Sequence, residues 1–196
     1  MARLRKSLLV FEKENRNMNK KITTVMVFNC LLFFILSSAE LKVDDMAPFF
    51  SVRSGDEKYL TFDDLRGKVA IIFYESSDVV DKNKELKKEL DKFYDAQNSD
   101  TKQKVIKVAV IDCSRAFWPF TVIWEKRLIN YSKENHLTVY GDWEGKMKTI
   151  YGFCQGESNF LILDKSGRVK FFRTGIILKD QFENIKKLIM QLVVLD

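Results

Sequence analysis

The fold class is decided by two stretches, VAIIFY at residues 69–74 and VIKVAVI at residues 105–111. Both are short, rich in β-branched residues and bounded by polar residues, which is typical of parallel strands buried on both faces. Between them, residues 81–96 place apolar side chains at helical spacing on one face and lysines and glutamates around the rest. This strand–helix–strand unit predicts a right-handed crossover.

The downstream sequence completes an α/β domain over residues 40–196. The elements expected there are a helix over 119–135 with Pro119 in its first turn, a short strand over 138–140, a β-hairpin of strands 160–163 and 169–172, and a closing helix over 179–194. The hairpin follows from the turn sequence DKSG between two apolar runs. Together these elements predict one domain with a central mixed sheet flanked by helices.

The first 39 residues have the pattern of a secretion signal peptide. Lys20 and Lys21 precede an apolar run over residues 22–36, and Ser37-Ser38-Ala39 follows as a small-residue cleavage site. The alternative is an uncleaved anchor, although the run is shorter than the ~20 apolar residues of a membrane helix. We therefore expect a periplasmic or secreted protein with no stable membrane span once the signal is cleaved.

Charge and cysteine usage narrow the functional classes. The 157 residues after the leader carry 26 Lys and Arg against 25 Asp and Glu. A nearly neutral domain has no general attraction to phosphate backbones, so nucleic acid is not an expected partner. Two cysteines remain, Cys113 and Cys154. Export would place them where a disulfide can persist.

Several short stretches resemble the redoxin group of thioredoxin-like proteins. MAPFF at residues 46–50 and GKV at 67–69 resemble the opening of that domain, and YG at 151–152 and FLILDKSGRV at 160–169 resemble its second half. The group includes the TlpA-like thiol oxidoreductases and the AhpC/TSA antioxidant proteins. The LDKSGRV stretch is most similar to the periplasmic YtfJ-type branch. The resemblance implies a thioredoxin-like fold.

The residues that carry the chemistry of this group are missing. A redoxin needs a thiolate at the N-terminus of the helix after the first core strand, where the helix dipole lowers its pKa. Residues 74–82 read YESSDVVDK and contain no cysteine near Val79 and Lys82, where the pair is expected. The group's cis-proline before the strand at residue 160 is also missing, because residues 155–159 read QGESN. We expect a trans bond there.

The polar residues at these two places are candidate binding residues. Ser76, Ser77 and Asp78 replace the reactive thiols, and their simplest role is capping of the following helix. A serine nucleophile would need a base, and the one histidine, His136, is predicted at the end of a surface helix. The other binding candidates at this end of the domain are Trp118, Glu157 and Ser158.

The two cysteines are the remaining redox candidates. Cys113 follows the strand at 105–111, and Cys154 precedes the strand at 160–163, so both could face one site. The strand at 69–74 should lie between them, which suggests more than the ~4.4–6.8 Å between Cα atoms that a disulfide allows. Buried, unreactive thiols are the commoner state. Catalysis by Cys113, Cys154 or both is the alternative.

The densest aromatic cluster is Phe117, Trp118, Phe120 and Trp124. We expect it to form core under a long loop, with an aromatic-lined pocket near Trp118 as the alternative. A single histidine and two cysteines lack metal-ligand spacing, and no glycine-rich phosphate loop is present. No metal or cofactor is therefore expected.

The sequence favours an exported, thioredoxin-like binding or accessory protein without thioredoxin-type redox activity. Its partner would be another envelope protein or a thiol protein. The competing hypothesis is a thiol–disulfide oxidoreductase or peroxiredoxin-like enzyme that uses Cys113, Cys154 or both.

Overall fold

The computed structural model describes residues 41–195. The predicted leader, residues 1–39, lies outside the described residues. Within the described range, each helix is too short or too polar to cross a membrane.

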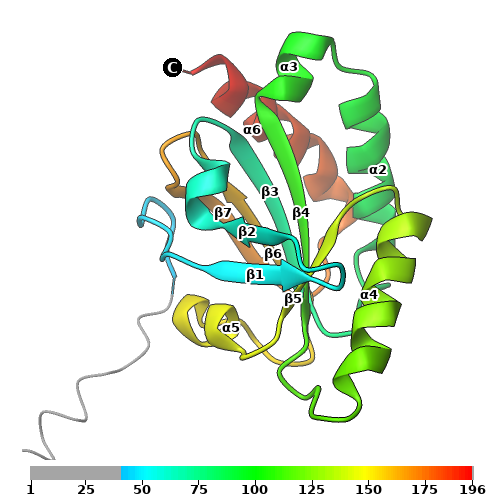
Figure 1. Cartoon of the computed structure of the whole chain (residues 1–196). Coiled ribbons are helices and arrows are strands. Elements are labelled where there is room, and N and C mark those ends of the chain that lie inside the picture. Colours follow the sequence, from blue (N-terminus) through cyan, green and yellow to red (C-terminus); the bar gives the residue numbers. More distant parts are fainter. Residues whose placement is uncertain (1–40, 196) are drawn as a thin grey trace, which may run out of the picture. The chain divides into compact units, whose positions relative to one another are not determined.

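The described residues form a seven-stranded sheet in the order β2-β1-β5-β4-β3-β6-β7 (Figure 1). Strands β5, β4 and β3 run parallel to one another, and the other neighbouring pairs are antiparallel. The strands are β1 (Ser51–Ser54), β2 (Tyr59–Thr61), β3 (Val69–Glu75), β4 (Val105–Asp112), β5 (Val139–Asp142), β6 (Asn159–Leu163) and β7 (Val169–Thr174). The predicted mixed sheet, its two buried parallel strands and the β6–β7 hairpin are confirmed.

Strand β3 holds the centre of the domain, because β4 and β6 pair with its two edges and all seven of its residues are buried. The parallel register with β4 runs from Val69 opposite Val105 to Glu75 opposite Ile111. On the other edge, Tyr74 lies opposite Asn159, the first residue of β6. The ends of β3 and β4 and the start of β6 therefore meet at one edge of the sheet.

Helices cover both faces of the sheet (Figure 1). They are η1 (Phe62–Leu65), α2 (Lys84–Asp95), α3 (Ser99–Gln103), α4 (Thr121–Glu134), α5 (Lys146–Tyr151), η2 (Lys179–Gln181) and α6 (Phe182–Val194). Side chains of a strand alternate between faces. Ile71 and Phe73 accordingly pack with α2 and α6, and Ile72 and Tyr74 pack with η1 and α5.

The helices that bury an apolar stripe do so as expected. In α2, Leu86 and Leu90 are buried and Phe93 is half-buried. In α6, the apolar stripe of Phe182, Ile185, Ile189 and Leu192 is buried on the same face of the sheet, with Leu188 partly exposed. Burial of these faces fixes the start of α2 close to the ends of β3 and β4.

The segment between β4 and α4 differs from expectation. Helix α4 begins at Thr121, so Pro119 lies before the helix and not in its first turn. In α4, Val122 is exposed, whereas Leu128 is buried. The predicted aromatic core is also wrong, because Phe117, Trp118 and Phe120 are exposed and only Trp124 packs partly inward. The reason is geometric: β4 ends at Asp112, so this segment runs past the end of the sheet.

Candidate functional site

The edge where β3 and β4 end is where α/β folds place ligands, and redoxin chemistry would occur there. Two segments face each other at this edge. The β3–α2 turn, residues 76–83, leaves the end of β3, and the pre-β6 loop, residues 154–158, leads into β6. They are neighbours because β3 and β6 are paired strands.

The predicted capping role of the β3–α2 turn is wrong. Hydrogen bonds from Val79 N to Ser76 O and from Lys82 N to Val79 O, both 3.0 Å, form successive turns. Helix α2 begins only at Lys84. Ser76, Ser77 and Asp78 therefore lie too far from the helix start to accept its free N–H groups.

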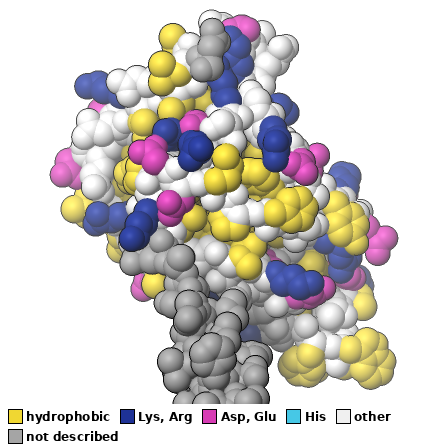
Figure 2. Space-filling model, turned by 90° about the vertical axis from the view of Figure 1, so that its left-hand side faces the viewer, with side chains coloured by type: hydrophobic (Ala, Val, Ile, Leu, Met, Phe, Trp, Pro, Cys, Tyr) yellow, Lys and Arg dark blue, Asp and Glu magenta, His cyan; other side chains and the backbone are white. Residues whose placement is uncertain are grey.

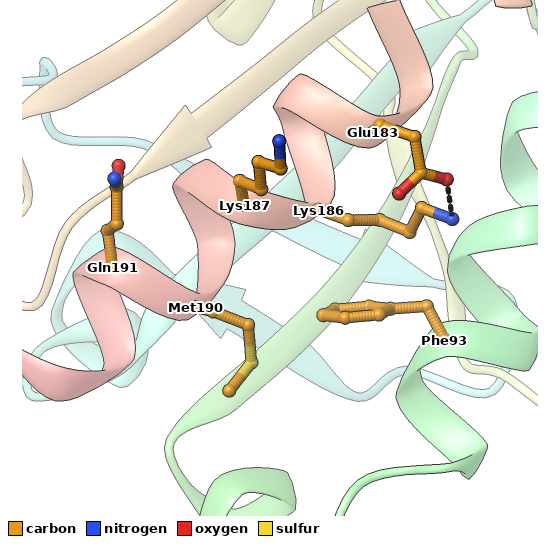
Figure 3. Close-up of a pocket in the computed structure, with 6 residues that line it drawn as sticks. All are labelled: Phe93, Glu183, Lys186, Lys187, Met190 and Gln191. Atoms are coloured by element: carbon orange, nitrogen blue, oxygen red, sulfur yellow. Dashed lines mark ion pairs between the residues drawn. The ribbon is translucent and has the colours of Figure 1, made fainter.

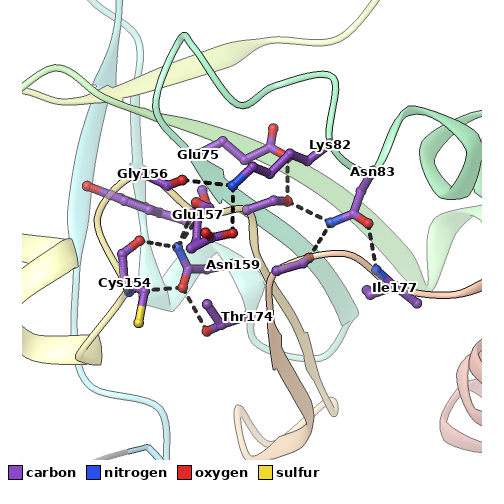
Figure 4. Close-up of polar contacts among 12 residues, drawn as sticks. Glu75, Lys82, Asn83, Cys154, Gly156, Glu157, Asn159, Thr174 and Ile177 are labelled. Carbon is purple, nitrogen blue, oxygen red and sulfur yellow. Dashed lines mark hydrogen bonds and ion pairs between the residues drawn. The ribbon is translucent and has the colours of Figure 1, made fainter.

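The turn is held by Asn83, which is buried at the start of α2 (Figure 4). Its amide nitrogen donates to Ser158 Oγ at 2.8 Å and to the Gly175 carbonyl at 2.9 Å. Its amide oxygen accepts from Ile177 N at 2.9 Å. Asn83 thus ties α2 to the pre-β6 loop and to the segment after β7, so its side chain is unavailable for capping.

A buried carboxylate continues this network. Glu75, only 3% exposed, accepts a hydrogen bond from Ser158 Oγ at 2.6 Å and pairs with Lys87 Nζ at 2.5 Å. Lys87 also donates to the Val80 carbonyl at 2.8 Å. Burial raises the pKa of Glu75 above its ordinary value, and the contacts with Lys87 and Ser158 only partly oppose this rise. The chain therefore keeps an ion pair between the buried Glu75 carboxylate and the Lys87 ammonium group.

The two segments are also joined at the surface by Lys82, which occupies one of the positions where a redoxin cysteine was expected. Its Nζ atom lies 2.7 Å from Glu157 Oε2 and donates to the Gly156 carbonyl at 3.0 Å (Figure 4). The Lys82–Glu157 ion pair therefore joins the two segments where the thiol and the cis-proline loop of a redoxin would face each other.

The pre-β6 loop is fixed from within by Asn159. Its amide nitrogen donates to the Cys154 and Glu157 carbonyls, each at 3.1 Å, and its oxygen accepts from Cys154 N at 3.0 Å. The expected trans bond before Asn159 is confirmed, because Trp118–Pro119 is the one cis peptide among residues 41–195. Side-chain amides therefore shape this loop in place of a proline.

Neither of the two cysteines within residues 41–195 is arranged for exchange chemistry. Cys113 is buried, Cys154 is exposed, and both are free. They belong to opposite sides of β3, which lies between β4 and β6 as expected. Burial raises the pKa of the Cys113 thiol to about 12, with further contributions from Asp112 and Asp142. This thiol is chemically inert near neutral pH.

A second polar cluster, missed by sequence reasoning, lies beside Cys113. Lys148 Nζ pairs with Asp112 at 2.7 Å and its backbone N donates to Asp142 at 3.0 Å. The Tyr74 hydroxyl donates to the same Asp142 oxygen at 3.1 Å. Burial, followed by the charge of Asp142, raises the pKa of Tyr74. The Asp112 carboxylate keeps a low pKa because its bonds with Lys148 and Ser114 outweigh burial.

Two cavities lie near the helices. One of about 290 Å³ opens between α4 and the β3–α2 turn, with Val80, Ile111 and Leu128 as apolar walls and Ser77 and Arg127 among its polar groups. The other, about 380 Å³, is lined by Phe93 of α2 and by residues of α6 (Figure 3). Phe93 lies nine residues into α2, roughly 14 Å along the helix from its start. Only the first cavity adjoins the edge described above.

The structure separates the predicted binding residues into three groups. Glu157 and Ser158 belong to the network that ties the loops together. Ser77 lines the cavity beneath α4, Ser76 lies beside it in the turn, and Asp78 is exposed. Trp118 is exposed on the β4–α4 segment. Glu75, Asn83 and Lys87 were missed, since each resembles an ordinary polar helix or strand-end residue until its distant partners are known.

Comparison with known proteins supports the fold. No protein-family model and no curated protein sequence matches the chain. Solved structures do match. A protein from Chlorobium tepidum assigned as a thiol:disulfide interchange protein of the DsbE type shares 17% identity over 79% of this chain and 99% of that chain, with a TM-score of 0.59. A peroxiredoxin-like protein from Aquifex aeolicus shares 21% over 76% and 88%, with a TM-score of 0.52.

A third similar structure is BsSco, a member of the Sco family of cytochrome c oxidase assembly proteins. It shares 11% identity over 80% of this chain and 99% of that chain, with a TM-score of 0.55. At such identities the similarity shows the fold alone. The chain therefore has a thioredoxin-like fold of the redoxin type, as the sequence predicted, and it lacks a cysteine pair at the position where that fold carries one.

Proposed function

We propose that this chain is an exported, thioredoxin-like binding or accessory protein that does not exchange thiols and disulfides. One observation carries the proposal. The turn that would hold the reactive thiols has none, and Lys82 and Asn83 join it to the opposite loop through Glu157 and Ser158. The edge is closed where a partner disulfide would need to enter.

The remaining thiols are poor substitutes. With a pKa of about 12, only about one Cys113 side chain in 10⁵ is a thiolate at pH 7. Among residues 41–195, the exposed Cys154 has no second cysteine beside it to resolve a mixed disulfide, because Cys113 is free and belongs to the other side of β3. These two facts argue against the oxidoreductase and peroxiredoxin-like alternatives.

The cavity beneath α4 is the site we assign to binding. Its walls of Val80, Ile111 and Leu128 suit an apolar group, and Arg127 with Glu134 at the same cavity suits a polar group that can meet both charges. An amphipathic ligand or a side chain of an envelope protein has this chemistry. A periplasmic or secreted location and kinship with the YtfJ-type branch belong to the same proposal and rest on the leader and LDKSGRV sequences.

Thiol titration combined with activity assays tests the proposal. In the folded protein we expect Cys154 to react with a disulfide reagent and Cys113 to stay unreactive until denaturant is added. Insulin reduction and peroxide turnover should both stay at the background rate. The Cys113→Ser and Cys154→Ser variants, with circular dichroism as the check on folding, should give the same background. Turnover above background that disappears in Cys113→Ser would establish the enzyme and overturn the proposal.

A further inference from the structure

The β4–α4 segment presents an unusual exposed apolar surface. Trp118 is 84% exposed, Phe117 66%, and Phe120 48%. Val122 and Ile123 in the first turn of α4 are also about half exposed. We call these five residues the aromatic tip. Contiguous apolar side chains of this size on a soluble domain mark an interaction site more often than an accident of packing.

The aromatic tip is supported by its own side chains. The rings of Phe117 and Phe120 pack edge to face with centroids 5.2 Å apart. The Phe120 N–H donates to the Phe117 carbonyl at 2.7 Å, which closes a tight turn around Trp118. The turn thus holds Trp118 outward. Because this side chain is exposed, it can enter an apolar medium without leaving the hydrophobic core.

Basic residues surround the aromatic tip. Arg115 precedes it, and Lys126 and Arg127 follow it one turn along α4. All three are exposed and form no ion pair among residues 41–195. The intervening carboxylate, Glu125, is instead paired with Arg53 at 3.1 Å. The pKa of the exposed Asp78 is lowered first by the nearby Ser76 hydroxyl and more weakly by Arg115.

The segment also protrudes from the domain. Figure 1 shows the β4–α4 segment at the lower end of the described domain, beyond the end of β4. Figure 2 shows hydrophobic side chains projecting from the lower edge of the face that it presents. A protruding apolar tip is convex, so it presents side chains for insertion and not a groove that receives a partner's side chains. Aromatic side chains do favour the boundary between lipid headgroups and acyl chains.

From the apolar tip, its unpaired basic rim and its protrusion, we propose that residues 117–123 dock the domain on a bilayer that contains anionic lipid. Trp118 and Phe117 enter the acyl boundary, and Arg115, Lys126 and Arg127 contact the headgroups. Each basic side chain near such a surface contributes about 1 kcal/mol, equivalent to about fivefold in partition. The proposal is independent of the thiol chemistry, and it shares only Arg127 with the cavity under α4.

A single-tryptophan variant gives a local test in the full chain. The sequence has three tryptophans, so Trp124→Phe with Trp143→Phe leaves Trp118 as the sole emitter. On adding phosphatidylglycerol vesicles, we expect a blue shift of the emission and quenching by brominated acyl chains. Vesicles of phosphatidylcholine alone should give much weaker quenching. Because the reporter is local, contact of the leader with lipid does not produce this signal.

Matched variants complete the test. A reporter at the exposed Tyr59, made as Tyr59→Trp with all three native tryptophans changed to Phe, should not be quenched. Lys126→Ala should weaken partition about fivefold, and Lys187→Ala, an exposed lysine of α6, should not change it. Where the single-tryptophan chain fails to fold, the blue shift of the unmodified chain and its loss in Trp118→Phe replace it.

Three results would overturn the proposal. These are an unshifted, unquenched Trp118 with anionic vesicles, equal quenching of the Tyr59→Trp reporter, and equal response to anionic and neutral lipid. Loss of a bound envelope protein in Trp118→Ala, without any response to vesicles, would assign the tip to a protein partner instead.

Discussion

The buried pair of Glu75 and Lys87 gives the sharpest test of the network. Lys87→Met keeps the length of the side chain and removes the cation that lies 2.5 Å from Glu75. Removing one partner of a buried pair costs about 3–5 kcal/mol because the other charge stays buried and unpaired. Lys87 is partly exposed, so we expect the lower end, about 3 kcal/mol at pH 8. The melting temperature should fall by about 6–12 °C.

The loss should depend on pH in a defined direction. Burial raises the pKa of Glu75 in the folded protein above 4.5, so the folded state binds this proton more tightly than the unfolded chain. Stability from that proton is present below pH 4.5 and is lost as the pH rises through the folded pKa. Removing Lys87 raises the folded pKa further. The deficit of Lys87→Met should therefore shrink to about 1 kcal/mol at pH 4.5 and grow toward pH 8.

Urea unfolding at both pH values, followed by circular dichroism, measures this difference. Lys88→Met makes the same change at the next, exposed residue and should stay within about 0.5 kcal/mol of wild type. Adding Glu75→Gln to Lys87→Met should recover most of the loss at pH 8. An equal loss at pH 4.5 and pH 8, or no recovery in the double variant, would show that the ionised carboxylate is not the cause.

Two further predictions concern the loops. Gly167→Ala should cost about 3 kcal/mol of stability, because the backbone has φ +87° and the new Cβ would lie 2.4 Å from the Phe62 ring. Gly152→Ala, at φ +65° with no atom within contact distance of the new Cβ, should cost about 1–2 kcal/mol. Urea unfolding compares the two variants, and equal costs would contradict the steric argument. Lys82→Ala should change stability by less than about 1 kcal/mol, because its ion pair is partly exposed. Hydrogen exchange should nevertheless accelerate at amides 79–84 and not in α6, and unchanged exchange would show that the ion pair does not hold the turn.

The fold could be predicted because its central strands and the β6–β7 hairpin have distinctive local sequence patterns. Strand β3 is buried on both faces and therefore appears as an uninterrupted apolar run, and the observed strand extends the predicted one only by Glu75. The β6–β7 hairpin was equally readable from its turn sequence. The three long helices were recovered to within three residues at each end, whereas η1 and α3 were not predicted. Helix α2 begins three residues later than predicted, at Lys84, because Asn83 just before it is committed to partners outside the helix.

The site could not be predicted in the same way, because its contacts join residues far apart in sequence. Glu75 meets a residue 83 positions later, and Asn83 meets one 94 positions later. Nothing in the local pattern distinguishes such residues from a solvated strand end or a helix face. The prediction of burial for the aromatic tip was wrong for the opposite reason. Hydrophobicity predicted burial, but the segment extends past the sheet, where no second layer covers it.

The missing thiols and the polar network have a common physical consequence for where this protein can bind. Opening the edge to an incoming chain would separate Lys82 from Glu157 and Asn83 from Ser158. Moving Ser158 would also remove a hydrogen bond from the buried Glu75. An unsatisfied buried acceptor costs about 1–3 kcal/mol, and more when it is charged. The closed edge is therefore the stable state, so we expect binding beside it, with a ligand in the cavity under α4 and a bilayer at the aromatic tip.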